Sequence, residues 1–103
     1  MSRRVKLSKT FEIESTLLLQ QGISRFGIAV VEQKRELIAQ TIEGFLARHP
    51  VRPIDTTLGI WCYPVSKTPF VLIYDFDDTE LRIHLIVHES ADRTTIDLSR
   101  IVW

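Results

Sequence analysis

The sequence predicts an α+β domain in which a short N-terminal strand and a two-helix hairpin precede a three- to four-stranded antiparallel sheet. Two patterns carry this prediction. Apolar residues recur at helical spacing through the first half of the chain, and they alternate with other residues in two later stretches, 58–65 and 70–88. The chain has 103 residues, of which 45% are hydrophobic, and this suffices for one core. We therefore expect a single domain that spans residues 1–103.

Short local signals predict the first strand and the first helix. The alternation of residues 5–8 is typical of a short edge strand. Thr10 can then cap a helix, and Glu12 in the first turn suits the positive end of the helix dipole. Gly22 interrupts the apolar run, so we expect this helix to end near Gln21, with residues 23–26 as a joint or an extra helical turn.

The second helix has the longest helical pattern and is predicted for residues 27–49. Apolar residues recur on one side at spacings of three, four and seven: Val31, Ile38, Ile42, Phe45 and Leu46. Pro50 ends the helix, because proline disfavours the α conformation in the residue before it. Residues 51–57 then form a linker between the helices and the sheet.

A strand is predicted for residues 58–65. Its alternation places two groups on opposite sides: Ile60 and Cys62 against Trp61, Tyr63 and Val65. Pro64 has no backbone donor, which favours a position at the edge of the sheet. Because Cys62 is the only cysteine, no internal disulfide is expected, and we interpret it as a small core residue.

A hairpin over residues 69–89 is the centre of the predicted sheet. Its first strand is apolar on both sides, with Phe70, Leu72, Tyr74 and Phe76 alternating with Val71 and Ile73. The polar stretch 77–80 favours a turn. The second strand alternates Leu81, Ile83, Leu85 and Val87 with Arg82, His84, Ile86 and His88. One face of the second strand is thus wholly apolar, and its mixed face is where we expect function.

The charge of the chain is balanced, with 13 Lys and Arg against 13 Asp and Glu. Nucleic-acid binders and membrane-surface proteins usually show a basic excess, so direct sequence-specific nucleic-acid binding is not expected. The basic start is followed by the mixed sequence of residues 11–14, so no signal peptide is expected. No window approaches the roughly 20 apolar residues of a membrane span. We expect a soluble, cytoplasmic protein.

The residue spacing does not favour a metal or cofactor site. His84 and His88 share a face of the predicted strand, but four residues span about 13 Å at roughly 3.3 Å each, which is too far for one ion. The glycines are scattered and form no phosphate-binding loop. We therefore expect no metal and no cofactor.

Acid–base cleavage of RNA is an alternative that the residue types permit. Such a site needs a base for the 2′-hydroxyl and cations for the phosphate. The side chains that could converge on the mixed face of the sheet are Lys67, Arg82, His84, His88 and Arg93. Arg82 is equally well interpreted as a solvated strand charge, and His88 as a hydrogen-bonded histidine near the end of the sheet.

The hairpin and the residues after it resemble a known family. The sequence of residues 69–74, PFVLIY, is followed by an acidic turn, an apolar strand and His88, with Asp92 and Arg93 close behind. This pattern resembles the RelE/ParE toxin family of bacterial type II toxin-antitoxin systems. The resemblance implies the same strand, helical hairpin and antiparallel sheet, and a toxin that inhibits growth and contributes to plasmid stabilization.

The branches of this family differ in mechanism, and the residue after Tyr74 separates them. RelE-like members are ribosome-dependent mRNA endonucleases that often carry an arginine directly after this tyrosine. Here Asp75 follows, and a carboxylate repels a scissile phosphate. The resemblance is therefore closer to ParE-like members, which inhibit DNA gyrase by binding and are not enzymes. A RelE-like endonuclease with a rearranged site stays open as the alternative, as does a scaffold that binds an antitoxin and poisons nothing.

The resemblance also implies partners and contact residues. A short, partly disordered cognate antitoxin is expected to lay an amphipathic segment across the helices, to extend the sheet by strand addition and to form a hetero-oligomer with the toxin. The residues predicted to contact it are Phe11, Leu18, Val31 and Ile38. For the target, DNA gyrase, the predicted contacts are His88, Arg93, Arg100 and Trp103. Trp103 is equally well interpreted as an aromatic that fixes the last segment to the core.

Overall fold

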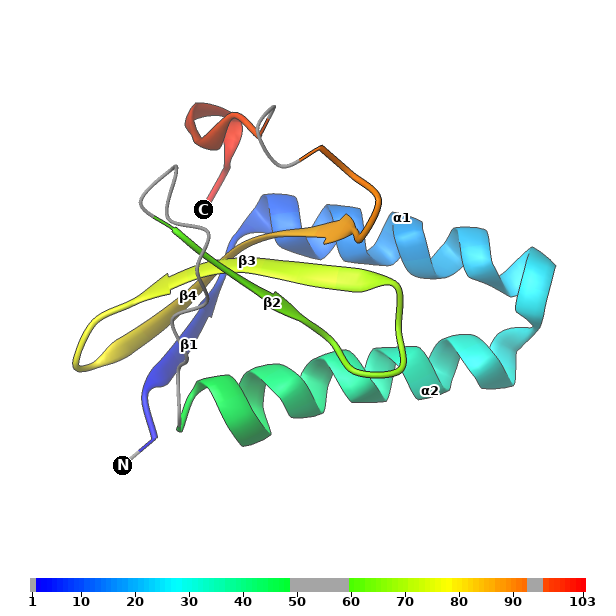
Figure 1. Ribbon diagram of the computed structural model, residues 1–103, viewed down its shortest axis with the longest axis horizontal. Helices are drawn as coiled ribbons and strands as arrows, with labels where there is room; N and C mark the ends of the chain where they lie inside the picture. Colours follow the sequence, from blue (N-terminus) through cyan, green and yellow to red (C-terminus); the bar gives the residue numbers. More distant parts are fainter. Residues whose placement is uncertain (1, 49–59, 93–95) are drawn as a thin grey trace.

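The described residues fold into one four-stranded sheet with a pair of helices on one face and the C-terminal segment on the other (Figure 1). The computed structural model describes residues 2–48, 60–92 and 96–103. In chain order its elements are β1 (Arg4–Leu7), α1 (Lys9–Phe26), α2 (Ile28–Ala39), the π-helical η1 (Gln40–Leu46), β2 (Trp61–Pro64), β3 (Phe70–Phe76), β4 (Glu80–His88) and the 3₁₀ turn η3 (Leu98–Arg100). The predicted α+β class is confirmed.

The order of the strands across the sheet is β1-β4-β3-β2, so β1 is an edge strand as expected. The pairs β2–β3 and β3–β4 are antiparallel, which confirms the predicted direction of these three strands. β1, in contrast, runs parallel to β4, with Val5 opposite Leu81. The sequence predicted no direction for this strand, because alternation indicates a strand but not its direction. The long helical hairpin supplies the crossover that a parallel neighbour needs.

The cap of α1 is Ser8 and not Thr10. The Ser8 hydroxyl oxygen accepts a hydrogen bond of 2.8 Å from the Phe11 amide, while its own backbone is extended. Ser8 is fully buried, between the start of the helix and β4. The helix therefore starts against the sheet, two residues earlier than the sequence indicated.

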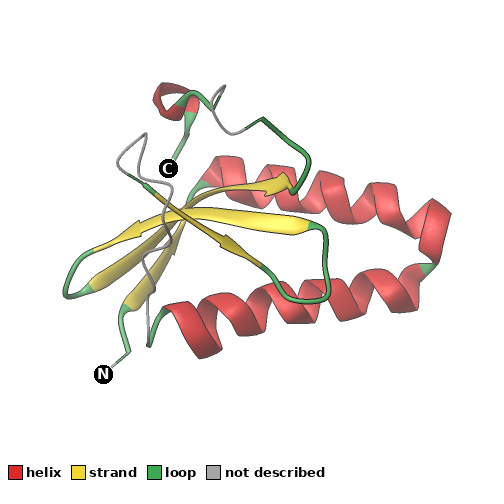
Figure 2. Ribbon diagram, viewed as in Figure 1, coloured by secondary structure: helices red, strands yellow, loops and turns green. Residues whose placement is uncertain are grey.

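The helix also runs past Gly22 to Phe26, so its predicted end near Gln21 is wrong, and the alternative of an extra helical turn over residues 23–26 is confirmed. A Cβ atom on Gly22 would lie 3.2 Å from Val31 Cγ2, which shows that this glycine lets the two helices approach closely. The chain turns instead at Gly27, whose φ of 85° falls in the region that favours glycine. Figure 2 shows the resulting hairpin, with its closed end beyond the ends of the strands.

The second helix confirms the predicted pattern but changes type. After Ala39 the path continues as the π-helix η1, in which the Ala47 amide donates to the Ile42 carbonyl over five residues. This longer bond places Ile42, Leu46 and Ala47 together in the core. The end of the second helix therefore stays packed against the main core.

The hairpin of β3 and β4 contains a β-bulge that reverses part of the predicted face assignment. Tyr74 pairs with Ile83 and Ile73 with Leu85, so His84 is the extra residue of β4. After the bulge, Ile86 faces the helices, whereas Leu85 and Val87 pack with the core on the other face. The predicted single apolar face of this strand is thus wrong beyond Ile83.

Both faces of the sheet are covered, as the sequence of the first hairpin strand indicated. The larger core lies under the helices and includes Leu72, Tyr74, Leu81 and Ile83, all fully buried. The smaller core, on the opposite face, contains Ile60, Cys62, Val71 and Ile73 and is covered by Ile96 and Leu98 of the C-terminal segment. The predicted sides of β2 and the interpretation of Cys62 as a core residue are confirmed. No helix in the described ranges is long and apolar enough to cross a membrane.

Candidate functional site

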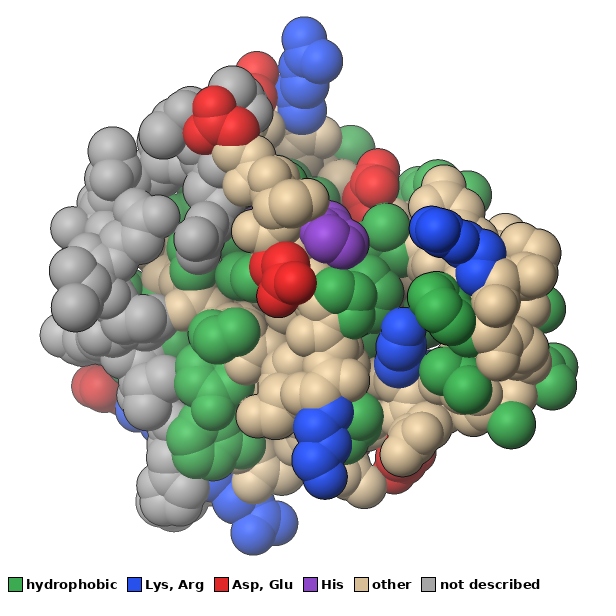
Figure 3. Space-filling model, turned by 45° about the vertical axis from the view of Figure 1, so that its right-hand side comes forward, with side chains coloured by type: hydrophobic (Ala, Val, Ile, Leu, Met, Phe, Trp, Pro, Cys, Tyr) green, Lys and Arg blue, Asp and Glu red, His purple; other side chains and the backbone are tan. Residues whose placement is uncertain are grey.

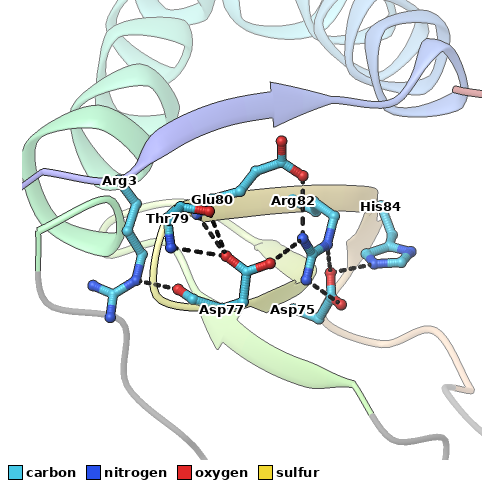
Figure 4. Close-up of polar contacts among 7 residues, drawn as sticks. All are labelled: Arg3, Asp75, Asp77, Thr79, Glu80, Arg82 and His84. Carbon is cyan, nitrogen blue, oxygen red and sulfur yellow. Dashed lines mark hydrogen bonds and ion pairs between the residues drawn. The ribbon is translucent and has the colours of Figure 1, made fainter.

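A cluster of charged side chains is centred on Arg82, beside the β3–β4 turn (Figure 4). It lies on the face of the sheet opposite the helices, called the outer face below. Its guanidinium forms a bidentate pair with Asp75, at 2.9 Å from Nε and 3.1 Å from Nη2. Nη1 donates to Asp77 at 3.0 Å and to Glu80 at 3.1 Å. Three carboxylates thus surround one guanidinium.

The local sequence produces this arrangement. Asp75 and Arg82 are cross-strand partners in β3 and β4, so their side chains lie on the same face. Asp77 opens the turn, where its Oδ1 accepts hydrogen bonds from the amides of Thr79 and Glu80. The predicted turn chemistry is confirmed, and the turn residues also supply two of the carboxylates that hold Arg82.

The pKa values of the cluster reflect this pairing. Burial raises the pKa of Asp75, but hydrogen bonds from Arg82 and His84 outweigh it and hold that pKa below its ordinary value. The hydrogen bond from Arg82, followed by those from the turn amides, lowers the pKa of Asp77 strongly. Hydrogen bonds to Asp75 and Asp77 in turn raise the pKa of Arg82. Asp75 and Asp77 are therefore ionised at neutral pH, and their two negative charges exceed the single positive charge of Arg82.

His84, the bulge residue, joins this cluster to the C-terminus. Its Nε2 lies 2.8 Å from Oδ1 of Asp75, and because an ionised carboxylate only accepts, Nε2 carries the proton and donates. The edge of one ring meets the face of the other in a T-shaped contact between His84 and Trp103, with centroids 4.8 Å apart. The ammonium of Lys6 lies 5.3 Å from the centroid of the Trp103 ring.

The last residues bind the start of α1 through their backbone. The carbonyl of Val102 accepts from the amides of Lys9 and Thr10, at 2.6 and 3.2 Å, and the Val102 amide donates to Thr10 Oγ1 at 2.8 Å. The amides in the first turn of a helix have no acceptors within the helix, and the Val102 carbonyl serves as the acceptor for two of them. Thr10, predicted as the cap, instead anchors the C-terminus.

The residues predicted to contact the target do not form one surface. Trp103 and Arg100 belong to the C-terminal segment; the Arg100 side chain is 87% exposed and pairs with Asp97. His88 lies at the other end of β4, opposite Phe70, where it hydrogen-bonds Ser90. Arg93 lies outside the described residues. Their assignment as target contacts stays a prediction.

The residues predicted to contact the antitoxin are mostly part of the core. Phe11, Val31 and Ile38 are at most 5% exposed, and Leu18 is partly buried against them. Phe11 and Ile38 nevertheless reach the surface of an open groove between β1, α1 and α2, with a volume of about 170 Å³. This groove, called the helix–β1 groove below, is lined mainly by Val5, Leu7, Phe11, Leu19, Ile38 and Ile42. Leu7 at its lip is 37% exposed.

The residues considered for RNA cleavage come together only in part. Arg82 and His84 are adjacent and share Asp75. His88 lies at the far end of β4, and Lys67 lies in the β2–β3 turn, where its φ is 64°. Among the described residues, no three His, Cys, Asp or Glu side chains are grouped so that they could hold a metal ion.

Three residues of the site were missed at the sequence level. Ser8 links the start of α1 to the bulge, Lys6 contacts Trp103, and Val102 caps the helix through backbone atoms. The serine directly before a helix start was a usable signal for a cap. Nothing in the sequence indicates the contacts of Lys6 and Val102, because they join residues more than 90 positions apart.

One solved structure of a known protein has a fold similar to that of this chain. No protein-family model and no curated protein matches the chain. A chain in the solved structure of the chromosomal ParDE TA system from P. aeruginosa has a similar fold, with a TM-score of 0.68 over 84% of this chain and 96% of that chain. The two sequences are 12% identical, so the likeness establishes the fold alone.

Proposed function

We propose that the chain is the toxin of a type II toxin-antitoxin pair and that it acts as ParE-like proteins do, by binding and inhibiting DNA gyrase. A cognate antitoxin neutralises it. The similarity of its fold to a chain of a ParDE system supports the class of protein. The hairpin sequence supports the ParE-like branch, since Asp75 follows Tyr74.

The surroundings of Arg82 carry the choice of binding over catalysis. An arginine that stabilises the transition state of phosphodiester cleavage must offer its donors to phosphate oxygens. Here the donors of Arg82 are directed at three carboxylates, whose negative charge opposes the approach of a phosphate. The cluster thus suits a structural role for the outer face of the sheet.

The C-terminal segment is the proposed contact with gyrase. Arg100 is exposed, Trp103 is 38% exposed at the end of the chain, and Val102 beside it is 57% exposed. Arginine and tryptophan are enriched in binding hot spots. Backbone hydrogen bonds of Val102 hold the segment that carries them here. Because gyrase acts on the chromosome, this function takes place in the cytoplasm.

The helix–β1 groove is the proposed site of the antitoxin. Its apolar lining fits the side chains of an amphipathic segment, and β1 pairs with a single strand, β4, within the described residues. An extended peptide along β1 would add a strand to the sheet and direct alternate side chains over Phe11 and Ile38. Toxin and antitoxin then form a hetero-oligomer.

Purified protein in two parallel assays tests this function. We expect inhibition of DNA supercoiling by gyrase at equimolar toxin, relieved by the cognate antitoxin, and intact mRNA on translating ribosomes. Expression of the chain alone in a bacterium should stop growth. Normal growth at full expression, or unaffected supercoiling, contradicts the proposal.

One observation favours the alternative, a RelE-like ribosome-dependent mRNA endonuclease. His84 donates to Asp75, and a histidine oriented by a carboxylate can serve as a general base. In that case mRNA is cleaved on the ribosome and the variant His84→Gln loses the cleavage. Under the ParE-like proposal the same variant still inhibits gyrase.

A further inference from the structure

A second hollow lies at the closed end of the helical hairpin and shares Leu19 with the helix–β1 groove. Its volume is about 220 Å³, and it opens between α1, α2 and the end of the sheet where β3 starts and β4 finishes. Figure 3 brings this side of the molecule forward and shows Lys and Arg side chains beside hydrophobic ones. We call it the hairpin-end pocket.

The floor of the hairpin-end pocket is apolar. Leu19, Val31 and Phe70 line it and are each at most 6% exposed, so they form a fixed surface that belongs to the main core. Phe26 stands at its rim with 55% of its surface exposed. A bulky apolar side chain placed here would cover Phe26 and contact the core.

The charged side chains that line the pocket, Arg25 and Lys34, are both positive. Arg25, Lys34 and His88 line the pocket, and its lining includes no Asp or Glu; Glu89 follows His88 in sequence but is not part of the lining. The ammonium of Lys34 lies 4.6 Å and the guanidinium carbon of Arg25 5.9 Å from the centroid of the Phe26 ring. Among the described residues neither cation pairs with a carboxylate, in contrast to Arg82 on the outer face.

His88 adds a hydrogen-bond donor to the lining. The Nδ1 atom of His88 accepts from the Ser90 amide at 3.1 Å, so in the neutral ring Nε2 carries the proton and is a donor. The helix dipoles add no net charge to the pocket, because the last turn of α1 and the first turn of α2 both line it. Its positive charge therefore comes from Arg25 and Lys34.

We propose that the hairpin-end pocket binds a segment of a partner polypeptide in which an Asp or Glu stands next to a bulky apolar side chain. The apolar side chain lies on Leu19, Val31 and Phe70, and the carboxylate is bound between Arg25 and Lys34. The charge complementarity selects an acidic segment, and the apolar floor selects a peptide over a nucleic-acid phosphate. This goes beyond the proposed function, because it does not depend on the target of the toxin.

Selection from a random 12-residue peptide library displayed on phage tests the proposal with the full-length protein. We expect the enriched peptides to carry Asp or Glu within four positions of Phe, Leu, Ile or Trp. A synthetic peptide of the enriched sequence should bind the double variant Arg25→Gln/Lys34→Gln at least about tenfold more weakly, by fluorescence anisotropy. Changing its acidic residue to the amide should have a similar effect.

The matched control is Arg48→Gln, which removes a cation near the opposite end of the second helix and should leave the affinity unchanged. Circular dichroism of the double variant should match that of the unaltered protein. The proposal is overturned if no peptide is enriched, if the enriched peptides lack acidic residues, or if the double variant binds them as well as the control does. Displacement of the peptide by an equal concentration of single-stranded DNA would also overturn it.

Discussion

The hydroxyl of Ser8 donates a hydrogen bond of 2.6 Å to the carbonyl of His84, the residue that bulges from β4. The same hydroxyl oxygen accepts from the amide of Phe11, and the Ser8 amide donates to the carbonyl of Ile83. A bulge interrupts the regular ladder of the sheet, so its backbone groups need other partners. Ser8 supplies one and starts α1 with the same side chain. The helix and the charged cluster are thereby fixed to one point.

Replacing Ser8 with alanine should therefore destabilise the fold. The variant loses the helix cap and leaves the partly buried His84 carbonyl without its hydroxyl donor, at a cost of about 1–3 kcal/mol in the free energy of unfolding. Urea unfolding followed by circular dichroism measures this loss. Ser24→Ala, at an exposed position of the same helix, should change stability by less than about 0.5 kcal/mol. Equal effects of the two variants would argue against the linking role of Ser8.

The free energy of unfolding should fall in acid, and Asp75 should account for part of the fall. Its pKa is lowered in the folded state, so the unfolded chain, with a carboxylate pKa near 3.9, binds protons first as the pH decreases. The stabilisation is thus complete above about pH 5 and is lost as the pH falls through the lowered pKa. Urea unfolding at pH 6, 4 and 3 should show a smaller decrease for Asp75→Asn than for the unaltered chain.

The control for this pH effect is Glu14→Gln, which removes an exposed carboxylate of α1 that pairs with no described residue. It should keep the full decrease in stability. The pH profile of Asp75→Asn will retain some slope, because the pKa values of Asp77 and Asp97 are also lowered. An unchanged profile for Asp75→Asn would mean that the pairing with Arg82 and His84 adds no net stability.

The helix–β1 groove makes a separate prediction about the antitoxin. Leu7 stands exposed at the lip of this groove, so Leu7→Asp should leave the core intact and place a charge against the apolar side chains of the partner. We expect binding of the cognate antitoxin to weaken at least about tenfold, or about 1.4 kcal/mol, by isothermal titration calorimetry. Leu17→Asp, outside the groove on α1, should bind normally. The groove is not the site if both variants bind equally.

The sequence predicted the type and extent of most elements because each side of the sheet and of the helices has a regular apolar pattern. It missed the bulge because Leu85, Ile86 and Val87 are all apolar and fit either face. Gly22 was misread because a glycine that stops a helix and one that allows close packing look alike in one sequence.

The candidate site was harder to predict than the fold. Asp75 and Arg82 are cross-strand partners, and the hairpin pattern alone places them on one face. The contact of His84 with Trp103 joins residues 19 positions apart and depends on the path of the last segment. Phe11, Val31 and Ile38 were expected at a surface because the helical pattern identifies an apolar side but not whether that side is covered by the sheet or by a partner.

Trp103 distinguishes a binding role for the C-terminus from a structural one. Trp103→Ala keeps the backbone hydrogen bonds of Val102 and should cost less than about 2 kcal/mol in the free energy of unfolding. The same variant should raise the toxin concentration needed for half-inhibition of gyrase at least about tenfold. Arg100→Ala, at an exposed position, should also weaken inhibition with no measurable change in stability. Trp103→Phe retains a ring against His84 and should restore stability more fully than inhibition, since it lacks the indole N–H. Full inhibition by Trp103→Ala and Arg100→Ala would leave the tryptophan as packing for His84 and exclude this segment as the gyrase contact.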